Sequence, residues 1–296
     1  MSRLIYDNII LDISKILSRN GETRSLSLLR MTKKLGSKIR EPLIFDHVIS
    51  GEKKIFRLPL TVNQNESIKI DWGDGEFEDI VNRDHMCLLH VVVVHKYPDY
   101  PTYKKYRIVI SGGKHSVNHI GYCSNWADKI TDFITLGNLG IADLSGLFRN
   151  CNGFNGRLSE NFNTVGVTDM SWMFCGAISF NQSFPAGRDT GNVRDMRYMF
   201  YSADSFNRAL NFNTSNVTDM CRMFAYAENF NSSLNFNTKN VRYMYGMFSF
   251  AKSFNQRLNF DIGNVKDMEN MFHSAISFNI DINWKPKSST VENLDR

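Results

Sequence analysis

The chain has 296 residues, which is long for one compact core and predicts two or three modules. Its 42% hydrophobic and 22% charged residues are typical of folded soluble protein, and no apolar run approaches the ~20 residues that cross a membrane. The net charge of +5 belongs to residues 1–43, with nine Lys/Arg against four Asp/Glu, whereas residues 131–284 hold twelve against thirteen. We therefore predict no nucleic-acid binding by the second half, because phosphate recognition needs a basic surface.

Residues 1–42 have the apolar spacing of two amphipathic helices, and Pro42 ends the second. The order Asp7-Asn8-Ile9-Ile10-Leu11-Asp12-Ile13, followed later by Leu29-Arg30-Met31, resembles an F-box. The resemblance implies that this segment contacts a Skp1-type adaptor of a ubiquitin ligase through Ile9, Ile10, Ile13 and Leu29. The alternative is a helical cap or docking segment.

Residues 43–115 alternate between apolar and polar, as in Ser67-Ile68-Lys69-Ile70-Asp71, and this period predicts strands. The run Asp71-Trp72-Gly73-Asp74-Gly75 predicts a tight turn, in which both glycines take positive φ and the carboxylates accept backbone N–H bonds. With His95-Lys96-Tyr97 and Tyr106-Arg107-Ile108, this turn resembles the PKD-like domain that precedes repeats of the BspA family. The resemblance implies a small β-sandwich.

Two sets of side chains raise the question of a metal or acid–base site. Asp71 and Asp74 are close in sequence, and His115 and His119 would share one face of a helix. Neither set has a third ligand at suitable spacing, so we predict no metal, no cofactor and no catalytic residue. The five cysteines have no metal or redox spacing and residues 1–12 lack a signal-peptide pattern, which together predict an intracellular protein with reduced thiols.

Residues 116–284 form a repeat array of about six units, in which a Met-Phe pair returns every 26 and then every 24 residues. A unit this short cannot bury its own apolar face, so the pattern predicts a solenoid of stacked coils. Val217, Met220, Met223 and Phe224 have helical spacing, and Leu234-Asn235-Phe236 alternates as a strand does. The predicted core contains Met173, Phe174, Met199, Phe200, Met223, Phe224, Met247, Phe248, Met271 and Phe272, and an inward amide ladder contains Asn181, Asn207, Asn231 and Asn255.

The unit Asn-Val-Thr-Asp-Met-x-x-Met-Phe, followed by Ala-x-x-Phe-Asn, resembles the BspA-like leucine-rich-repeat family with DUF285-type repeats. This family is known from mycoplasma surface proteins and from large DNA viruses. The resemblance implies one strand and one short helix per coil and a protein-binding surface. Residues 285–296 are polar and predict a disordered tail. The arginines that we expect to contact a partner are Arg157, Arg188, Arg208 and Arg257.

Together these patterns predict an α+β multidomain protein with a short N-terminal helical module, a small β-sandwich and an α/β solenoid of about six 24–26-residue coils. We expect a non-enzymatic protein that recognises another protein, and the F-box resemblance implies a substrate receptor of a ubiquitin ligase. The alternative is a BspA-like surface or adhesion protein.

Overall fold

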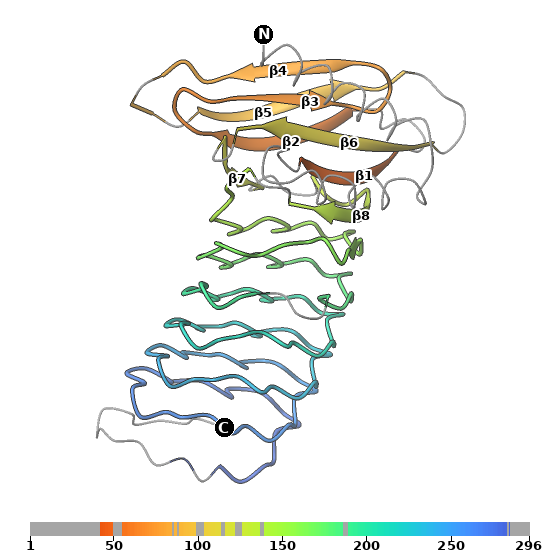
Figure 1. Ribbon diagram of the computed structural model, residues 1–296. Helices are drawn as coiled ribbons and strands as arrows, with labels where there is room; N and C mark the ends of the chain where they lie inside the picture. The colour runs from red at the N-terminus through yellow and green to blue at the C-terminus, as the bar shows by residue number, and fades with distance from the viewer. Residues whose placement is uncertain are drawn as a thin grey trace.

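The computed structural model describes residues 42–49, 55–84, 86–87, 89–98, 104–113, 116–121, 126–136, 139–185, 189–282 and 284. Two β-sheets lie at one end of the molecule, and a stack of coils extends from them (Figure 1). The predicted helical module at residues 1–42 lies outside the described residues, apart from Pro42.

The larger sheet has the strand order β4-β3-β6-β1-β8-β9. Neighbouring strands pair antiparallel as far as β8, and β9 pairs parallel with β8. The strands are β1 (Leu43–Ile49), β3 (Ser67–Asp71), β4 (Phe77–Val81), β6 (Lys104–Gly112), β8 (Ile130–Thr135) and β9 (Arg157–Leu158). Because β9 belongs to the first coil, the sheet continues directly into the stack.

The smaller sheet has the order β5-β2-β7. Its strands are β2 (Ile55–Val62), β5 (Leu89–Lys96) and β7 (Val117–Ile120). Phe56, Leu58 and Leu60 on β2 are buried, and the Phe56 ring centroid lies 6.0 Å from that of Phe45 on β1 of the larger sheet, as expected when two sheets pack face to face. β7 and β8 extend the sheets beyond residue 115, where we predicted that the sandwich ends.

The turn between β3 and β4 has the geometry that its sequence predicts. Gly73 and Gly75 have φ values of 78° and 105°. A Cβ atom at Gly73 would lie 2.5 Å from the backbone oxygen of Arg107, so only glycine fits. The Asp71 carboxylate accepts the N–H of Gly73 at 2.9 Å, and the Asp74 carboxylate accepts that of Glu76 at 3.1 Å.

The predicted α/β solenoid is wrong, because no helix occurs in the described part of the chain. The N–H of Phe224 bonds to the carbonyl of Met247 in the next coil, and that of Met223 bonds to Met220 in its own coil. Phe rings at equivalent places in successive coils have centroids 5.6 Å apart, for example Phe224 and Phe248. Packed helices need about 8–10 Å between their axes. Coils at the observed spacing leave no room for one helix each.

Each coil instead contains an eight-residue turn segment, and Met220–Ala227 is a representative one. Arg222 and Tyr226 take left-handed backbone φ values of 51° and 60°, so the chain changes direction every four residues. A chain that turns in this way directs its first, fourth, fifth and eighth side chains inward, which gives the same apolar spacing as a helix. The turn segments are 144–151, 170–177, 196–203, 220–227, 244–251 and 268–275.

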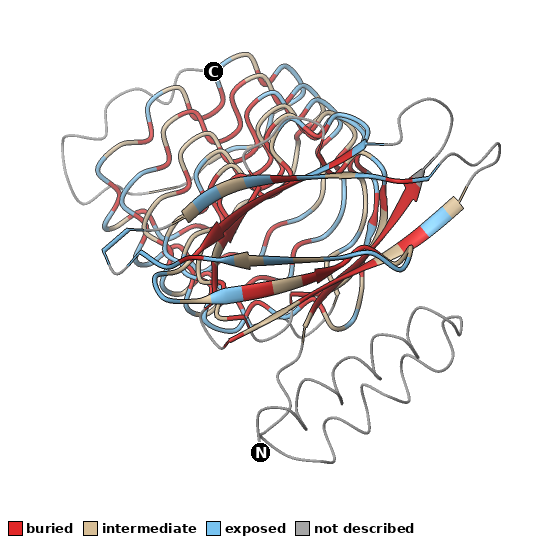
Figure 2. Cartoon of the chain, turned by 90° about the horizontal axis from the view of Figure 1, so that it is seen from above, coloured by how far each residue is buried: buried red, intermediate tan, exposed pale blue. Residues whose placement is uncertain are grey.

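The inward side chains of the turn segments form a continuous column of core. All ten predicted Met and Phe core residues are at most 2% exposed. Viewed from above, buried and exposed stretches alternate along the coils (Figure 2). Phe224 stacks on Phe200 and Phe248 in the neighbouring coils and on Phe230 in its own, with ring centroids 4.1–5.6 Å apart. These rings bury one another across coils, so each coil depends on its neighbours.

Candidate functional site

The outward surface of the turn segments is the most distinctive surface of the stack, and we call it the turn face. It consists of the second, third, sixth and seventh residues of each segment. In Met220–Ala227 these are Cys221, Arg222, Ala225 and Tyr226, of which Ala225 is buried and the other three reach the surface. Unlike the core positions, which repeat the same residue types, the turn-face positions differ from coil to coil.

The backbone of the turn face is left-handed at the third and seventh position of every segment. Glycine, and next asparagine, fit this conformation best, and other residues pay roughly 1–2 kcal/mol. The structure holds small or polar residues at seven of these positions, which are Gly146, Asn150, Gly176, Ser202, Gly246, Asn270 and Ser274. The other five hold bulky side chains, which are Trp172, Tyr198, Arg222, Tyr226 and Phe250. The same fold therefore accepts either kind, and the bulky residues are not required by the backbone.

The bulky aromatic residues stack on one another across coils. The rings of Trp172 and Tyr198 are 3.9 Å apart and nearly parallel, and those of Tyr226 and Phe250 are 4.6 Å apart. Tyr201 joins the two pairs, with centroid distances of 5.5 Å to Tyr198 and 5.3 Å to Tyr226. We call these five residues together with Tyr245 the aromatic strip. Because the ring faces cover one another, the strip presents mainly ring edges.

Two arginines lie on the aromatic strip. The Arg149 guanidinium is 4.5 Å from the centre of the Trp172 ring. The Arg222 guanidinium is 5.2 Å from the Tyr245 ring and 6.0 Å from the Tyr198 ring. Within the described ranges, neither arginine has a carboxylate at ion-pair distance, in contrast to Arg197, which pairs with Asp195 at 3.1 Å. Both guanidinium groups are thus held by rings and carry uncompensated charge.

A line of carboxylates borders the turn face, one residue before five of the six turn segments. Each carboxylate accepts the N–H of the residue two places later, at 2.7–3.1 Å. The fifth segment has Tyr243 in this place. Burial, together with the charges of Asp169 and Asp219, raises the pKa of Asp195 to about 6. This acidic border consists of Asp143, Asp169, Asp195, Asp219 and Asp267.

The family described as "Mycoplasma protein of unknown function, DUF285" matches residues 122–211 and 208–296. These two segments cover more than half of the chain. The chain belongs to this family. No curated protein and no solved structure matches it. In the described residues of this DUF285 protein, no helix is both long and apolar enough to span a membrane.

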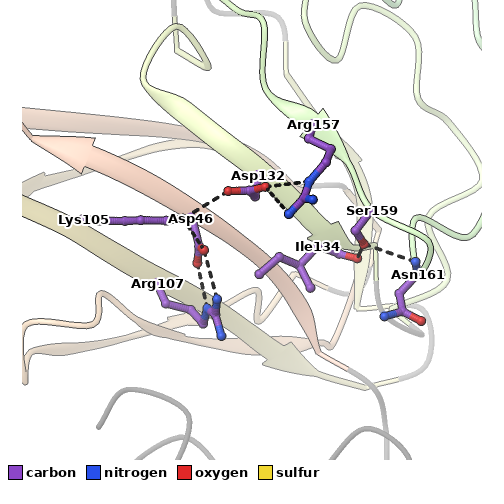
Figure 3. A network of polar contacts seen from close by, with 8 residues as sticks. All are labelled: Asp46, Lys105, Arg107, Asp132, Ile134, Arg157, Ser159 and Asn161. Atoms are coloured by element: carbon purple, nitrogen blue, oxygen red, sulfur yellow. Dashed lines mark hydrogen bonds and ion pairs between the residues drawn. The ribbon is translucent and has the colours of Figure 1, made fainter. Parts of the chain in front are cut away.

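The predicted partner-binding arginines of the DUF285 repeats do not gather in one place. Arg157 on β9 bonds to Asp132 at 3.0 Å, in a network that also joins Lys105, Asp46 and Arg107 (Figure 3). Burial opposes ionisation of Asp132, but Lys105 and Arg157 hold its pKa below the ordinary value. Arg157 therefore connects the first coil to the larger sheet.

Of the remaining arginines, Arg208 donates its Nε–H to the carbonyl of Asn181 at 2.9 Å, and Arg257 is exposed. Arg188 lies outside the described residues. The apolar contacts proposed for a ligase adaptor, Ile9, Ile10, Ile13 and Leu29, also lie outside them. None of the described predicted arginines is on the turn face.

The repeated asparagines link neighbouring coils at the surface. The Asn181 amide oxygen accepts the N–H of Asn207 at 3.1 Å, and the Asn207 oxygen accepts that of Asn231 at 3.0 Å. Asn231 and Asn255 continue the series. Their side chains are half-buried or exposed, so the ladder runs along the outside of the stack and not inward as we expected.

Asp74 contacts His95 but forms no metal-binding cluster. His95 Nε2 lies 2.8 Å from the Asp74 carboxylate, and its ring stacks on Trp72 at 4.6 Å. His119 Nε2 bonds to the carbonyl of Ser145, and His115 lies outside the described residues. Over the described ranges, no three His, Cys, Asp or Glu side chains come together to hold a metal ion.

Sequence reasoning missed the turn face because it considered only the residues that are the same in every repeat. The signal lies in the letters that vary at one place of the repeat, where glycine, tryptophan, tyrosine, arginine, glycine and asparagine follow one another from Gly146 to Asn270. An exchange between glycine and large aromatic residues at one repeat position indicates a left-handed site that the fold does not constrain further.

Proposed function

We propose that this DUF285 protein is a non-enzymatic recognition protein whose turn face binds another protein. The family assignment is consistent with a repeat-type surface or recognition protein. The observation that carries the proposal is the aromatic strip, in which four of the six residues have left-handed backbone. Tyr, Trp and Arg are the residue types that contribute most binding energy in protein interfaces. Backbone strain that the fold does not need supports a binding role.

The proposal is tested by giving four strip positions the residues found at equivalent places in other coils. The variant carries Trp172→Gly, Tyr198→Asn, Tyr226→Ser and Phe250→Ser. We expect it to fold as the parent does, because glycine, asparagine and serine already occupy this backbone conformation elsewhere in the stack. A partner isolated with the full chain and identified by mass spectrometry should bind the purified parent and lose at least about tenfold in affinity for the variant.

Two controls keep this test specific to the turn face. Arg208→Gln and Arg257→Gln change exposed residues outside the face and should leave the affinity unchanged. If the variant with the four substitutions binds the same partner as tightly as the parent, the turn face is not the recognition surface.

A narrower form of the proposal makes the protein a substrate receptor of a ubiquitin ligase. It is supported by the F-box resemblance of residues 1–42, with Ile9, Ile10 and Ile13 contacting a Skp1-type adaptor. Paired Ile9→Asp and Ile13→Asp changes should abolish co-purification of adaptor and cullin from eukaryotic lysate. Recovery of no adaptor with the unchanged chain would exclude this role and leave the turn face as a recognition surface.

The alternative, a BspA-like surface or adhesion protein, would use the same turn face outside the cell. Cys151 and Cys175 are free and buried, and burial raises the pKa of the Cys175 thiol to about 11. Such thiols persist in a reducing compartment, which favours our proposal of an intracellular protein. Immunofluorescence on intact and on permeabilised cells separates the two roles, since only a surface protein is stained without permeabilisation.

A further inference from the structure

A pocket of about 230 Å³ opens on the turn face between the fourth, fifth and sixth turn segments. Arg222, Tyr226, Tyr245, Phe250, Asn270 and His273 contribute to its lining. The pocket combines one fixed positive charge with ring edges and polar groups. This composition suits a small anionic group attached to an apolar chain.

Arg222 is the fixed charge of the pocket. Its guanidinium lies 5.2 Å from the centre of the Tyr245 ring, and the Tyr245 hydroxyl accepts a bond from the Asn270 amide at 3.3 Å. A Cβ atom at Gly246 would lie 3.3 Å from Cγ of Arg222, so the absence of a side chain at Gly246 leaves room for the aliphatic part of the Arg222 side chain to pass over it. A guanidinium held in this way has lost its freedom before a ligand arrives, which favours tight binding.

The charges around the pocket select the kind of ligand. The turn face carries the cations Arg149, Arg197 and Arg222 against one acidic residue, Glu269. Arg197 is already paired with Asp195, so the uncompensated guanidinium groups are those of Arg149 and Arg222. The acidic border runs alongside and repels anions there, which confines an anionic ligand to the aromatic strip.

The ring geometry argues against a nucleic acid as the ligand. Single-stranded nucleic acids bind by stacking bases on free aromatic faces. Here the faces of Trp172 and Tyr198 cover each other, as do those of Tyr226 and Phe250. Ring edges carry partial positive charge and attract carboxylates and other acceptors. A carboxylate also matches the two parallel N–H groups of a guanidinium.

We infer that the Arg222 pocket binds a carboxylate side chain of an extended acidic segment in a protein partner. This inference rests on the proposed function and specifies the chemistry of the partner. Arg149 lies three coils away, which is roughly 14 Å along the stack at ~4.8 Å per coil. An extended peptide covers that distance in about four residues. The ligand thus carries a second carboxylate at least four residues from the first, with apolar residues between them against the strip.

The probe for the test is a synthetic twelve-residue peptide with glutamate at every fourth position and tyrosine and serine between. Its twin has glutamine in place of each glutamate. Fluorescence anisotropy should show that the full chain binds the glutamate peptide about tenfold tighter than the twin, with an affinity that falls as salt rises. Arg222→Gln should remove most of this difference. Arg242→Gln, which deletes an exposed charge outside the turn face, should preserve it.

Three results would overturn the inference. They are equal affinity for the two peptides, no binding of either at about 1 mM, and tighter binding of oligothymidylate than of the glutamate peptide. Each leaves the proposed function standing if an isolated partner still depends on the aromatic strip. Loss of that dependence, with the peptide preference intact, would instead refute the proposed function and keep the acidic-peptide site.

Discussion

His47 is a buried imidazole on β1, 3% exposed, whose ring centroid lies 4.2 Å from that of Phe56. Its Nδ1 has no hydrogen-bond partner in the structure. Burial, and secondarily the charge of Lys129, lowers the pKa of His47 to about 3. Below about pH 6.5 the His47 imidazole is therefore protonated in the unfolded chain, whereas in the folded protein it stays neutral. This group makes no difference above that pH and destabilises the fold progressively as the pH falls toward 3.

Replacing His47 with Phe should reduce this acid sensitivity. Phe fills a similar volume beside Phe56 and carries no titratable group. Between pH 6.5 and 4.5 we expect the free energy of unfolding of the parent to fall by up to about 1.4 kcal/mol per pH unit more than that of the variant. Urea melts at the two pH values measure it. His273→Asn, at an exposed histidine, should retain the slope of the parent.

Asp195 responds to pH in the opposite direction. Its folded pKa of about 6 lies above the ordinary value of 3.8 because of burial and the neighbouring acidic border. A raised carboxyl pKa gives stability that is complete below about pH 3.8 and is lost as the pH rises through 6. Asp195→Asn keeps the acceptor for the N–H of Arg197 and removes the charge.

We expect Asp195→Asn to stabilise the protein at pH 7.5 by on the order of 1 kcal/mol, and to have little effect at pH 3.5. Denaturant melts at both pH values check it. Asp261→Asn is the matched control, because Asp261 is exposed and accepts a similar bond from Gly263 at 2.8 Å. A stabilisation that is equal at both pH values would show that the charge of the border is not its cause.

Among the secondary-structure elements, sequence reasoning assigned the turn segment wrongly as a helix, and the predicted strand at Leu234-Asn235-Phe236 is only an isolated bridge of Leu234 with Leu210. The period of the repeat and its buried residues, such as Met223 and Phe224, follow from the pattern because apolar spacing depends only on which side chains point inward. A helix and a pair of four-residue turns share that spacing. The left-handed φ of Arg222 distinguishes the turns from a helix, but arginine is not a residue type that predicts a left-handed conformation. Gly246, at the equivalent position of the next coil, does predict a left-handed conformation, but this is seen only when the coils are aligned position by position.

The join between sandwich and stack also could not be predicted, because it depends on contacts distant in sequence. Trp126 Nε1–H donates to the Leu147 carbonyl at 2.6 Å, and His119 Nε2 lies 2.5 Å from the Ser145 carbonyl. These carbonyls occupy the positions that accept bonds from a preceding coil elsewhere in the stack. The first coil has no preceding coil, so the side chains of His119 and Trp126 donate the hydrogen bonds that a preceding coil would otherwise supply.

Trp126→Phe tests this capping role, because it keeps an aromatic ring beside Phe148 and removes the N–H. A buried carbonyl left without a donor costs about 1–3 kcal/mol. We expect a loss of that size in the free energy of unfolding from denaturant melts. A loss under about 0.5 kcal/mol would mean that water or a local shift satisfies the Leu147 carbonyl and that the cap contributes little.

For the whole molecule, the turn segments give the stack a direction. In Met220–Ala227, the N–H groups of the first, third, fifth and seventh residues all donate to carbonyls of the next coil, at 2.8–2.9 Å. The sandwich covers the carbonyl end of the stack through His119 and Trp126. At the other end, the corresponding N–H groups of Met268, Asn270, Phe272 and Ser274 have no backbone acceptor among the described residues.

A stack that is capped at one end and open at the other should lose its coils from the open end. Each coil contacts only its neighbours, so its stability is a sum of local terms and opening propagates one coil at a time. Hydrogen exchange followed by mass spectrometry or NMR measures the local stability of each coil at one position of the repeat.

We expect the protection of the first amide in each turn segment to rise steadily toward the sandwich, in the order Met268, Met244, Met220, Met196 and Met170. Trp126→Phe should weaken protection at Leu144 and Met170 more than at Met244, because it damages only the capped end. Equal protection along the series would show that the stack opens as a single cooperative unit, and the direction of its hydrogen bonds would then have no consequence for its stability.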